Sequence, residues 1–267
     1  MIIATVLVKL EGEDSMQLQE LSNLKEKIND NRPIAPELMK TIAQKFREEW
    51  TYHTNAIEGN TMTLQETSFF LREGLTAKGK TLREHFEVIN HSEAVYYLQD
   101  AIRDRELSVG LIKEFHAMLF EGVKSWASGM KISPGAFKSQ DNHVLTPSGE
   151  IHHYTRAVQV PVEMEKLMDW YDKQNKIEHP IVIAAEFHHR FVAIHPFQGG
   201  NGRVGRLCMN FILMKAGYPP AIIRQEERLD YYLALEQADK GDITPFIELI
   251  KLAVERSLKT MAEVLIR

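Results

Sequence analysis

The sequence predicts an all-α domain that carries one β-hairpin, and three observations lead to this fold class. Apolar residues recur every three or four positions along most of the 267-residue chain, which is the spacing of helices with one buried face. Glycine, asparagine and proline end these periodic stretches, as they commonly do after a helix. Only the stretch near 136–155 departs from the helical period, because the turn signal Pro147-Ser148-Gly149-Glu150 lies between Val144-Leu145 and Ile151 and predicts a hairpin.

The composition is that of an ordinary globular protein, with 44% hydrophobic and 26% charged residues. Acidic residues outnumber basic ones by 37 to 32 and give a net charge of -5, so we expect no nucleic acid partner. Cys208 is the only cysteine, which excludes a disulfide framework and a cysteine-based zinc site. No apolar run approaches the ~18 residues of a membrane span, and Ile2–Val8 lacks the features of a signal peptide. We therefore expect a cytoplasmic protein without a membrane partner.

The first predicted helix contains Leu18, Leu21, Leu24 and Ile28, and a polar stretch before Pro33 ends it. Two interpretations of its apolar face are open. The face forms the seam of a homodimer, or it is buried within one molecule, which is the more common case.

The second predicted helix begins at Pro36, where a missing N–H costs nothing, and ends at Gly59-Asn60. Further helical patterns occupy roughly 63–74, 81–104, 108–121, 161–174, 180–194, 202–216, 227–239 and 244–265. We divide the chain into an N-terminal helical region, 1–60, and a larger domain, 61–267.

A glycine-rich loop runs into the predicted helix at 202–216. Gly199, Gly200 and Gly202 allow backbone N–H groups to approach an anion closely, and the dipole at the start of a helix favours negative charge there. A loop of this kind is by itself a weak signal, because many loops before helices are rich in glycine. Its neighbours in the sequence make it specific.

Arg203 and Arg206 are three residues apart and lie on one face of the first helical turn. Two guanidinium groups beside a nest of N–H groups suit a polyphosphate better than a single carboxylate. His195 comes just before the loop, where a neutral imidazole can take a proton from an incoming hydroxyl. The alternative interpretation, solvated arginines and a core histidine, does not explain why these residues occur together.

The segment from His195 to Arg206 resembles the signature of the Fic family, H-x-F-x-(D/E)-G-N-G-R-x-x-R. The residues that match it are His195, Phe197, Gly200, Asn201, Gly202, Arg203 and Arg206. The likeness continues through 184–194, 207–210 and 216–220 and covers about residues 35–253. It implies a Fic-type helical bundle with one hairpin, whose core spans about 108–253.

Fic proteins mostly transfer AMP from ATP to a Ser, Thr or Tyr hydroxyl of a target protein. The resemblance implies that His195 is the general base, that Arg203 and Arg206 hold the β- and γ-phosphates, and that Asn201 fixes the loop around the α-phosphate. We assign Tyr231 or Tyr232 to adenine stacking, with core packing as the equal alternative. The ATP site that we predict comprises Gly199, Gly200, Asn201, Gly202, Arg203, Val204, Gly205, Arg206, Tyr231 and Tyr232.

The predicted hairpin resembles the family's flap, which orders the target by pairing with it as a β-strand. Its residues here are Asn142, His143, Val144 and Leu145. The sequence does not name the target protein, because such pairing is made by the backbone and tolerates many sequences.

Position 199 departs from the signature, because Gly199 stands where the family has an acidic residue that binds magnesium. Glycine offers a hard cation no side-chain oxygen. Mg²⁺ remains an expected companion of ATP, but we assign no side chain as a metal ligand. The pairs His152-His153 and His188-His189 are poor chelators, since neighbouring helical side chains point in different directions.

The stretch Thr54-Asn55-Ala56-Ile57-Glu58-Gly59-Asn60 resembles the family's inhibitory motif, (S/T)-x-x-x-E-(G/N). Thr54 and Glu58 are four residues apart, hence on one helix face. The resemblance implies that Glu58 pairs with Arg206 and occupies the place of the γ-phosphate. The alternative is a glutamate that points into water.

Three classes of function follow. The first is a protein adenylyltransferase that Glu58 inhibits within the same chain. The second is another enzyme on the same site, a phosphotransferase or a de-AMPylase in which Glu58 positions water. The third is a nucleotide-sensing module without catalysis, and His195 argues against it because a pure binder has no need of a base.

Overall fold

The computed structural model describes residues 12–31, 34–123, 132–145 and 148–265. Ile2–Val8, Pro33 and Pro147, which the sequence analysis named, lie outside these residues. The described elements are the helices α1 (Gly12–Asn29), α2 (Pro36–Ile57), α3 (Leu64–Glu73), α4 (Leu82–Asp104), α5 (Val109–Leu119), α7 (Val160–Gln174), α8 (Pro180–Ile194), α9 (Asn201–Lys215), α10 (Arg228–Asp239) and α11 (Thr244–Leu265), the short 3₁₀ helices η1 (Ala157–Gln159) and η2 (Gln225–Glu227), and the strands β1 (His143–Leu145) and β2 (Ile151–His153).

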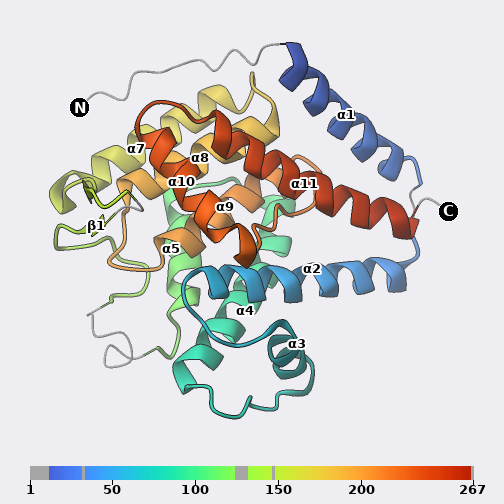
Figure 1. Cartoon of the computed structure of the whole chain (residues 1–267), viewed down its shortest axis with the longest axis horizontal. Helices are drawn as coiled ribbons and strands as arrows, with labels where there is room; N and C mark the ends of the chain where they lie inside the picture. The colour runs from blue at the N-terminus through green and yellow to red at the C-terminus, as the bar shows by residue number, and fades with distance from the viewer. Residues whose placement is uncertain (1–11, 32–33, 124–131, 146–147, 266–267) are drawn as a thin grey trace.

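The predicted fold class, helical with one hairpin, is confirmed (Figure 1). Strands β1 and β2 pair antiparallel, with Val144 opposite His152, and they form the one sheet in the described residues. Each predicted helix is present within about two residues of its expected ends. The agreement follows from the strong helical period, because a long amphipathic pattern defines one apolar face that can pack against the core.

Helices α8 and α9 form the centre of the molecule, and α2, α4, α7, α10 and α11 surround them (Figure 1). Their close approach depends on Gly205, which faces the rings of His188 and Phe191. An added Cβ at this position would lie 3.0 Å from the His188 ring and 3.2 Å from Phe191. The connection between these two helices carries the signature residues.

Helix α1 packs against α11 (Figure 1). Leu18, Leu21 and Ile28 are buried in the core. The face that they form is therefore buried within one molecule, and the alternative of a dimer seam on this face is wrong. A homodimer that uses another surface stays a prediction.

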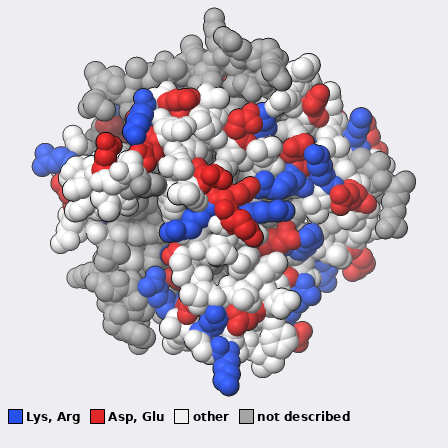
Figure 2. Space-filling model, viewed as in Figure 1, with Lys and Arg blue, Asp and Glu red and all other residues white. Residues whose placement is uncertain are grey.

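None of the described helices is long and apolar enough to cross a membrane. On the face shown in Figure 2, basic and acidic side chains are interspersed over the described part of the surface. This distribution agrees with the small net charge of -5.

The close packing of α9 on α8 predicts opposite effects for two glycine substitutions. Gly205→Ala should lower the free energy of unfolding by roughly 1–3 kcal/mol, because the new methyl group must displace buried rings. Gly110→Ala is the matched control: Gly110 is exposed in α5 and an added Cβ meets only Ser108 Oγ at 3.7 Å. This variant should be neutral or gain up to about 1 kcal/mol. Chemical denaturation of both variants measures the difference, and equal stabilities would contradict the packing argument.

Candidate functional site

The turn from α8 to α9 places His195. This residue caps α8 in the left-handed conformation, with φ 52° and ψ 59°, and it is the one non-glycine residue with positive φ in the described chain. A side chain in this region is strained, and such strain is typical of functional positions. The turn swings the imidazole away from the helix axis toward the start of α9.

Asn201 closes the loop that follows. Its side-chain oxygen accepts a hydrogen bond from Phe197 N at 2.9 Å, and its side-chain nitrogen donates one to Phe197 O at 2.9 Å. Phe197 in turn stacks on the ring of His116, with ring centroids 3.9 Å apart. The side chain of Asn201 thus holds the loop in shape, as the resemblance implied, and contacts backbone only.

Each glycine of the loop lies in a place where a side chain would meet a different neighbour. Gly200 caps α9 with φ 74°, and an added Cβ would lie 2.6 Å from the Phe120 ring. At Gly199 an added Cβ would lie 3.2 Å from Ile132 Cδ1. At Gly202 an added Cβ would lie 2.5 Å from Glu58 Oε1. The carboxylate of Glu58 therefore occupies the space directly over the first turn of α9.

Glu58 reaches this place because α2 ends in a Schellman motif. Gly59 N donates to Ala56 O at 3.0 Å and Asn60 N donates to Asn55 O at 3.0 Å, while Gly59 adopts φ 96°. These two bonds satisfy the last carbonyls of the helix and turn the chain sharply. Glu58, the capping residue, is left with its side chain directed at α9.

Arg206 binds the end of α2 through several contacts. Its Nη2 donates to Glu58 Oε1 at 2.7 Å, and its Nε donates to Thr54 Oγ1 at 2.8 Å. Its Nη1 donates to the hydroxyl of Tyr231 at 3.3 Å. The Arg206 side chain is only 2% exposed, whereas that of Glu58 is 32% exposed. The pair that the resemblance implied is present, and its carboxylate faces a cavity.

The charges of the site favour an anion at this position. Burial opposes ionisation of Glu58, but the charges of Arg206 and Arg203 outweigh it and hold the pKa of the carboxyl below its usual value. Burial also opposes the charge of Arg206, yet Tyr231 and Glu58 raise the guanidinium pKa. With the helix dipole of α9 in addition, the first turn of α9 is an anion site that Glu58 fills.

Arg203 lies on the same face of α9 but has different partners. Its Nη1 donates to Asn55 Oδ1 at 3.4 Å and lies 3.7 Å from Glu87 Oε1. The guanidinium is buried, 5.4 Å over the Phe120 ring. Both arginines of the signature therefore contact the last turns of α2, and Arg203 is directed away from the cavity.

His195 is a neutral imidazole in this environment. Its Nδ1 is 3.3 Å from Val192 O, and since a carbonyl only accepts, Nδ1 carries the proton and Nε2 keeps its lone pair. Burial, followed by the charge of Lys138, lowers the pKa of His195 to about 3. The residue is therefore in the form of a base at any physiological pH.

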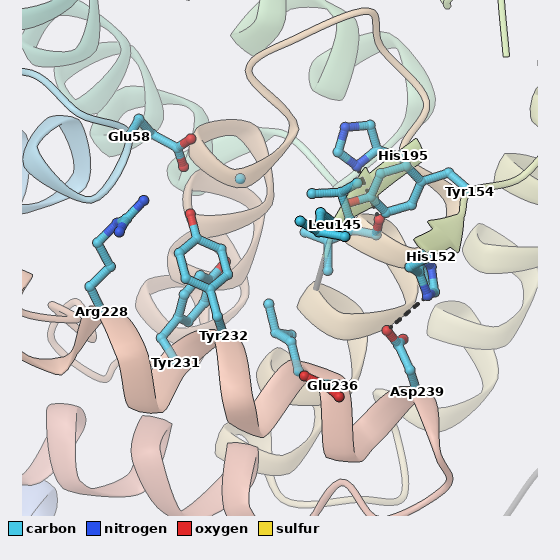
Figure 3. A pocket seen from close by; sticks show the side chains of 15 residues that line it. Glu58, Leu145, His152, Tyr154, His195, Arg228, Tyr231, Tyr232, Glu236 and Asp239 are labelled. Carbon is cyan, nitrogen blue, oxygen red and sulfur yellow. Dashed lines mark hydrogen bonds and ion pairs between the residues drawn. The ribbon is translucent and has the colours of Figure 1, made fainter. Parts of the chain in front are cut away.

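A cavity of about 460 Å³ connects these groups (Figure 3). Its volume lies within the range typical of small-ligand sites, roughly 300–1,000 Å³. Figure 3 shows Glu58 at one end of it and Leu145 of the hairpin, together with Tyr154 and His195, at the other. The full lining is Glu58, Val144, Leu145, His152, Tyr154, Val192, Ala193, His195, Gly202, Arg228, Tyr231, Tyr232, Leu235, Glu236 and Asp239.

The two tyrosines of α10 have different surroundings. Tyr231 is 1% exposed, and its hydroxyl bonds Arg206 and, at 2.9 Å, His188 Nε2. Its ring therefore packs in the core and supports Arg206. Tyr232 is less buried and borders the cavity beneath the guanidinium of Arg228, which lies 5.2 Å from its ring. Of the two, Tyr232 has the flat face that a nucleobase can reach.

Of the ten residues of the predicted ATP site, Gly202, Tyr231 and Tyr232 border the cavity and the others do not. Val204 is fully buried and its N–H donates to Gly200 O within the helix, while Gly205 faces His188. Both belong to the packing of α9 on its neighbours and do not border the cavity. Their assignment to the ATP site stays a prediction. Sequence spacing included them because they stand between Arg203 and Arg206.

The structure adds residues that the sequence analysis did not assign to the site. Tyr154 stacks on His195, and Lys138, whose pKa burial lowers to about 8, lies close to the same imidazole. Asp239 lies 2.9 Å from His189 Nε2 and 3.4 Å from His152 Nδ1, and so joins α10 to α8 and β2. No motif marks these residues, because they meet only through the tertiary fold.

The loop does not fit a protein-held magnesium ion. A side chain at position 199 would meet Ile132 and Phe120, so the space there is apolar as well as lacking a carboxylate. Among the described residues no group of three His, Cys, Asp or Glu side chains could hold a metal. We therefore derive no chemical step through Mg²⁺.

Comparison with known proteins identifies a family and several relatives that this chain resembles. A model of the Fic/DOC family matches residues 106–213. The protein adenylyltransferase Fic of Nematostella vectensis is 36% identical over 259 residues, 94% of this chain and 57% of that protein. The protein adenylyltransferase fic-1 of Caenorhabditis elegans is 32% identical over 216 residues, 79% of this chain and 40% of that protein. The chain spans about half the length of these curated relatives.

Solved structures share the whole fold. The crystal structure of a Fic domain containing signaling protein from Bacteroides thetaiotaomicron has a TM-score of 0.85 at 30% identity and covers 93% of this chain, which covers 96% of that one. Fic-1 from C. elegans has a TM-score of 0.80 at 29% identity, with 94% of this chain and 72% of that chain covered. The chain belongs to the Fic family, and the resemblance in its sequence is confirmed.

The contact between Thr54 and Arg206 predicts a stability difference between two equivalent substitutions. Thr54→Val keeps the shape of a buried side chain but removes the acceptor of Arg206 Nε, and should cost roughly 1–3 kcal/mol. Thr67→Val is the matched control, because the buried Thr67 hydroxyl has no hydrogen-bond partner among the described residues. That variant should be neutral or stabilising. Equal losses in chemical denaturation would contradict a specific role of the Thr54 hydroxyl.

Proposed function

We propose that this protein is an adenylyltransferase, which transfers AMP from ATP to a hydroxyl of a target protein and is inhibited by its own Glu58. One observation carries the proposal: the base His195 and an anion site at the start of α9 border one cavity, and Glu58 fills the anion site. The names of the relatives support the same activity.

In this proposal the β- and γ-phosphates of ATP take the place of the Glu58 carboxylate on Arg206, and the loop closed by Asn201 surrounds the α-phosphate. The ring of Tyr232 faces the adenine of ATP. The target hydroxyl oxygen attacks the α-phosphorus, its proton passes to His195 Nε2, and the bond to the pyrophosphate breaks. Fixed N–H groups and a guanidinium then stabilise the charge that develops.

The same geometry supports an inhibitory role for Glu58. A carboxylate and a phosphate compete for one guanidinium and one helix terminus, so ATP binds fully only when Glu58 withdraws. Arg203 strengthens the inhibited state, since its bond to Asn55 joins it to the same helix. We assign α1 and α2, within residues 1–60, as the regulatory region and residues 61–267 as the catalytic one.

The hairpin is proposed to receive the target. Val144 and Leu145 border the cavity, while His143, the first residue of β1, and Asn142, which precedes it, are outside the lining. Strand pairing along β1 would place a target hydroxyl beside His195. The cytoplasmic location stays a prediction from the sequence.

A second candidate, removal of AMP from a target, is favoured by the position of Glu58. Its side chain is 32% exposed and borders the same cavity as His195, so in this candidate function the carboxylate orients a water molecule toward the phosphorus. In that reaction the water oxygen bonds to the phosphorus and loses a proton, the bond between the phosphorus and the target oxygen breaks, and the target oxygen takes a proton.

Labelled ATP distinguishes these functions. Transfer of label from the α-phosphate to the protein itself or to proteins of an added lysate indicates AMP transfer. Label from the γ-phosphate alone indicates phosphorylation, and release of AMP from a pre-labelled target indicates removal. Absence of all three would contradict an enzymatic function.

Glu58→Gly should raise AMP transfer to the protein itself and tighten ATP binding. A charge-assisted contact is worth about 1.5–3 kcal/mol, so its loss corresponds to a roughly ten- to hundredfold change. Glu49→Gly is the control for a weakened helix, because Glu49 lies in α2 and pairs with Lys45 instead. Unchanged α-label and unchanged ATP affinity in Glu58→Gly would contradict inhibition. If the protein removes AMP, the same variant should lose that activity.

His195→Ala should abolish transfer while it leaves the fold and ATP binding largely intact. The base acts on the hydroxyl proton in the transition state, and general base catalysis contributes roughly 10²–10⁴-fold. The measurement uses the Glu58→Gly background, in which transfer is expected to be highest, with calorimetric titration of ATP alongside. Transfer within about threefold of the background protein, well short of the general-base contribution, would exclude His195 as the base.

A further inference from the structure

Tyr154 lies face to face with the base. The ring centroids of Tyr154 and His195 are 3.7 Å apart and their planes differ by 17°. Tyr154 directly follows strand β2 and borders the cavity, where its ring covers one face of the imidazole (Figure 3). A contact between ring faces leaves the edge of the imidazole, with Nε2, uncovered.

The remaining contacts of His195 do not fix its ring. The left-handed backbone sets where the side chain starts, but the torsion about the Cβ–Cγ bond of histidine is broad and roughly two-fold. The bond from Nδ1 to Val192 O is long, at 3.3 Å, and selects which of the two flipped orientations is adopted. A flat neighbour is needed to set the plane of the ring, and Tyr154 provides it.

A closed series of contacts connects this stack to the hairpin. Tyr154 N donates to Asn142 O at 3.4 Å, at the end of the hairpin opposite its turn. Asn142 Oδ1 accepts a hydrogen bond from Lys138 Nζ at 2.6 Å, and Lys138 N donates to Pro196 O at 2.8 Å. The base and both strands of the hairpin are therefore joined through backbone as well as through the rings.

We propose that Tyr154 is a positioning residue for His195, which holds the imidazole plane so that Nε2 is directed at the hydroxyl brought by a segment paired with the hairpin. This inference rests on the proposed function, since it assigns His195 as the base. It gives the hairpin a second role, because a shift of the strands moves the ring that orients the base.

The first test reads the imidazole itself and needs no activity. Long-range ¹H–¹⁵N NMR distinguishes the two tautomers, and His195→Ala identifies the signal. The wild type and Tyr154→Phe should show one Nδ1–H tautomer that stays neutral at pH 5. The groups that face His195, which are Lys138, Glu58 and His152, are the same in every variant.

Tyr154→Leu removes the flat face and should give a mixture of tautomers and a higher pKa for His195, because water reaches the ring. Tyr154→Met, a second non-planar variant, should do the same and serves if the leucine variant is unstable. Tyr96→Leu is the matched control: Tyr96 is exposed on α4, and its variant should leave the His195 signal unchanged. A single tautomer and an unchanged pKa in both non-planar variants would overturn the proposal.

The second test measures transfer in the Glu58→Gly background. Tyr154→Leu should lower kcat roughly 10–100-fold, since misplacement of a catalytic group by about 1 Å costs on the order of 10²-fold. KM for ATP should stay within about twofold, because positioning of His195 affects the transfer of AMP and not ATP binding. Tyr154→Phe should retain kcat, because its ring is still flat. Equal losses in the phenylalanine and leucine variants would overturn the proposal by assigning the effect to the hydroxyl. If no protein transfers AMP but the NMR results hold, the proposed function fails and the positioning contact stands.

Discussion

The ion pair between Glu58 and Arg206 is the contact on which the observed state of the site depends. It joins the end of α2 to the first turns of α9, two segments that are 148 residues apart in the sequence. Arg206 is 2% exposed, and a guanidinium so deeply buried is stable only when its donors are satisfied. Thr54, Glu58 and Tyr231 supply the acceptors, so the rest of the site is arranged around one cation.

In the proposed function, inhibition and catalysis compete for the same groups. The dipole of α9, the loop N–H groups and Arg206 attract any anion, and the carboxylate of Glu58 is an anion that the chain itself carries. A phosphate can replace it without leaving the guanidinium unpaired. The equilibrium between the two states therefore depends on the end of α2, where the Schellman motif and the contacts of Asn55 and Asn60 with α4 fix Glu58.

The opposite end of the cavity is governed by weaker contacts. The hairpin is short, its strands are three residues each, and an isolated hairpin of this size is marginally stable. It depends on the body of the protein through the link from His152 to Asp239, the bond from Lys138 to Asn142 and the stack of Tyr154 on His195. A rigid anion site thus lies at one end of the cavity, and a lightly held hairpin lies beside His195 at the other. Such a division suits the proposed function, in which the site holds a nucleotide firmly and admits a protein segment.

The amino-acid sequence by itself determined the fold class, the extent of the helices and the residues of the central loop. Helical periodicity is a local property, and a glycine-rich loop before a helix with His195 and two arginines carries its chemistry in consecutive residues. The pairing of Thr54 and Glu58 on one helix face was likewise a matter of spacing.

The tertiary structure decided which groups meet. Arg203 and Arg206 lie on the same face of the first turn of α9, and the sequence does not distinguish them. Only Arg206 reaches Glu58, because the crossing of α2 over α9 directs Arg203 toward Asn55. Adjacent Tyr231 and Tyr232 both border the cavity, but Tyr231 is 1% exposed and its hydroxyl binds Arg206. Val204 is fully buried and Gly205 faces α8. Tyr154 lies 41 residues before His195 and meets it only because the hairpin folds back over the end of α8. Contacts of this kind depend on how helices pack, which spacing along a single chain does not encode.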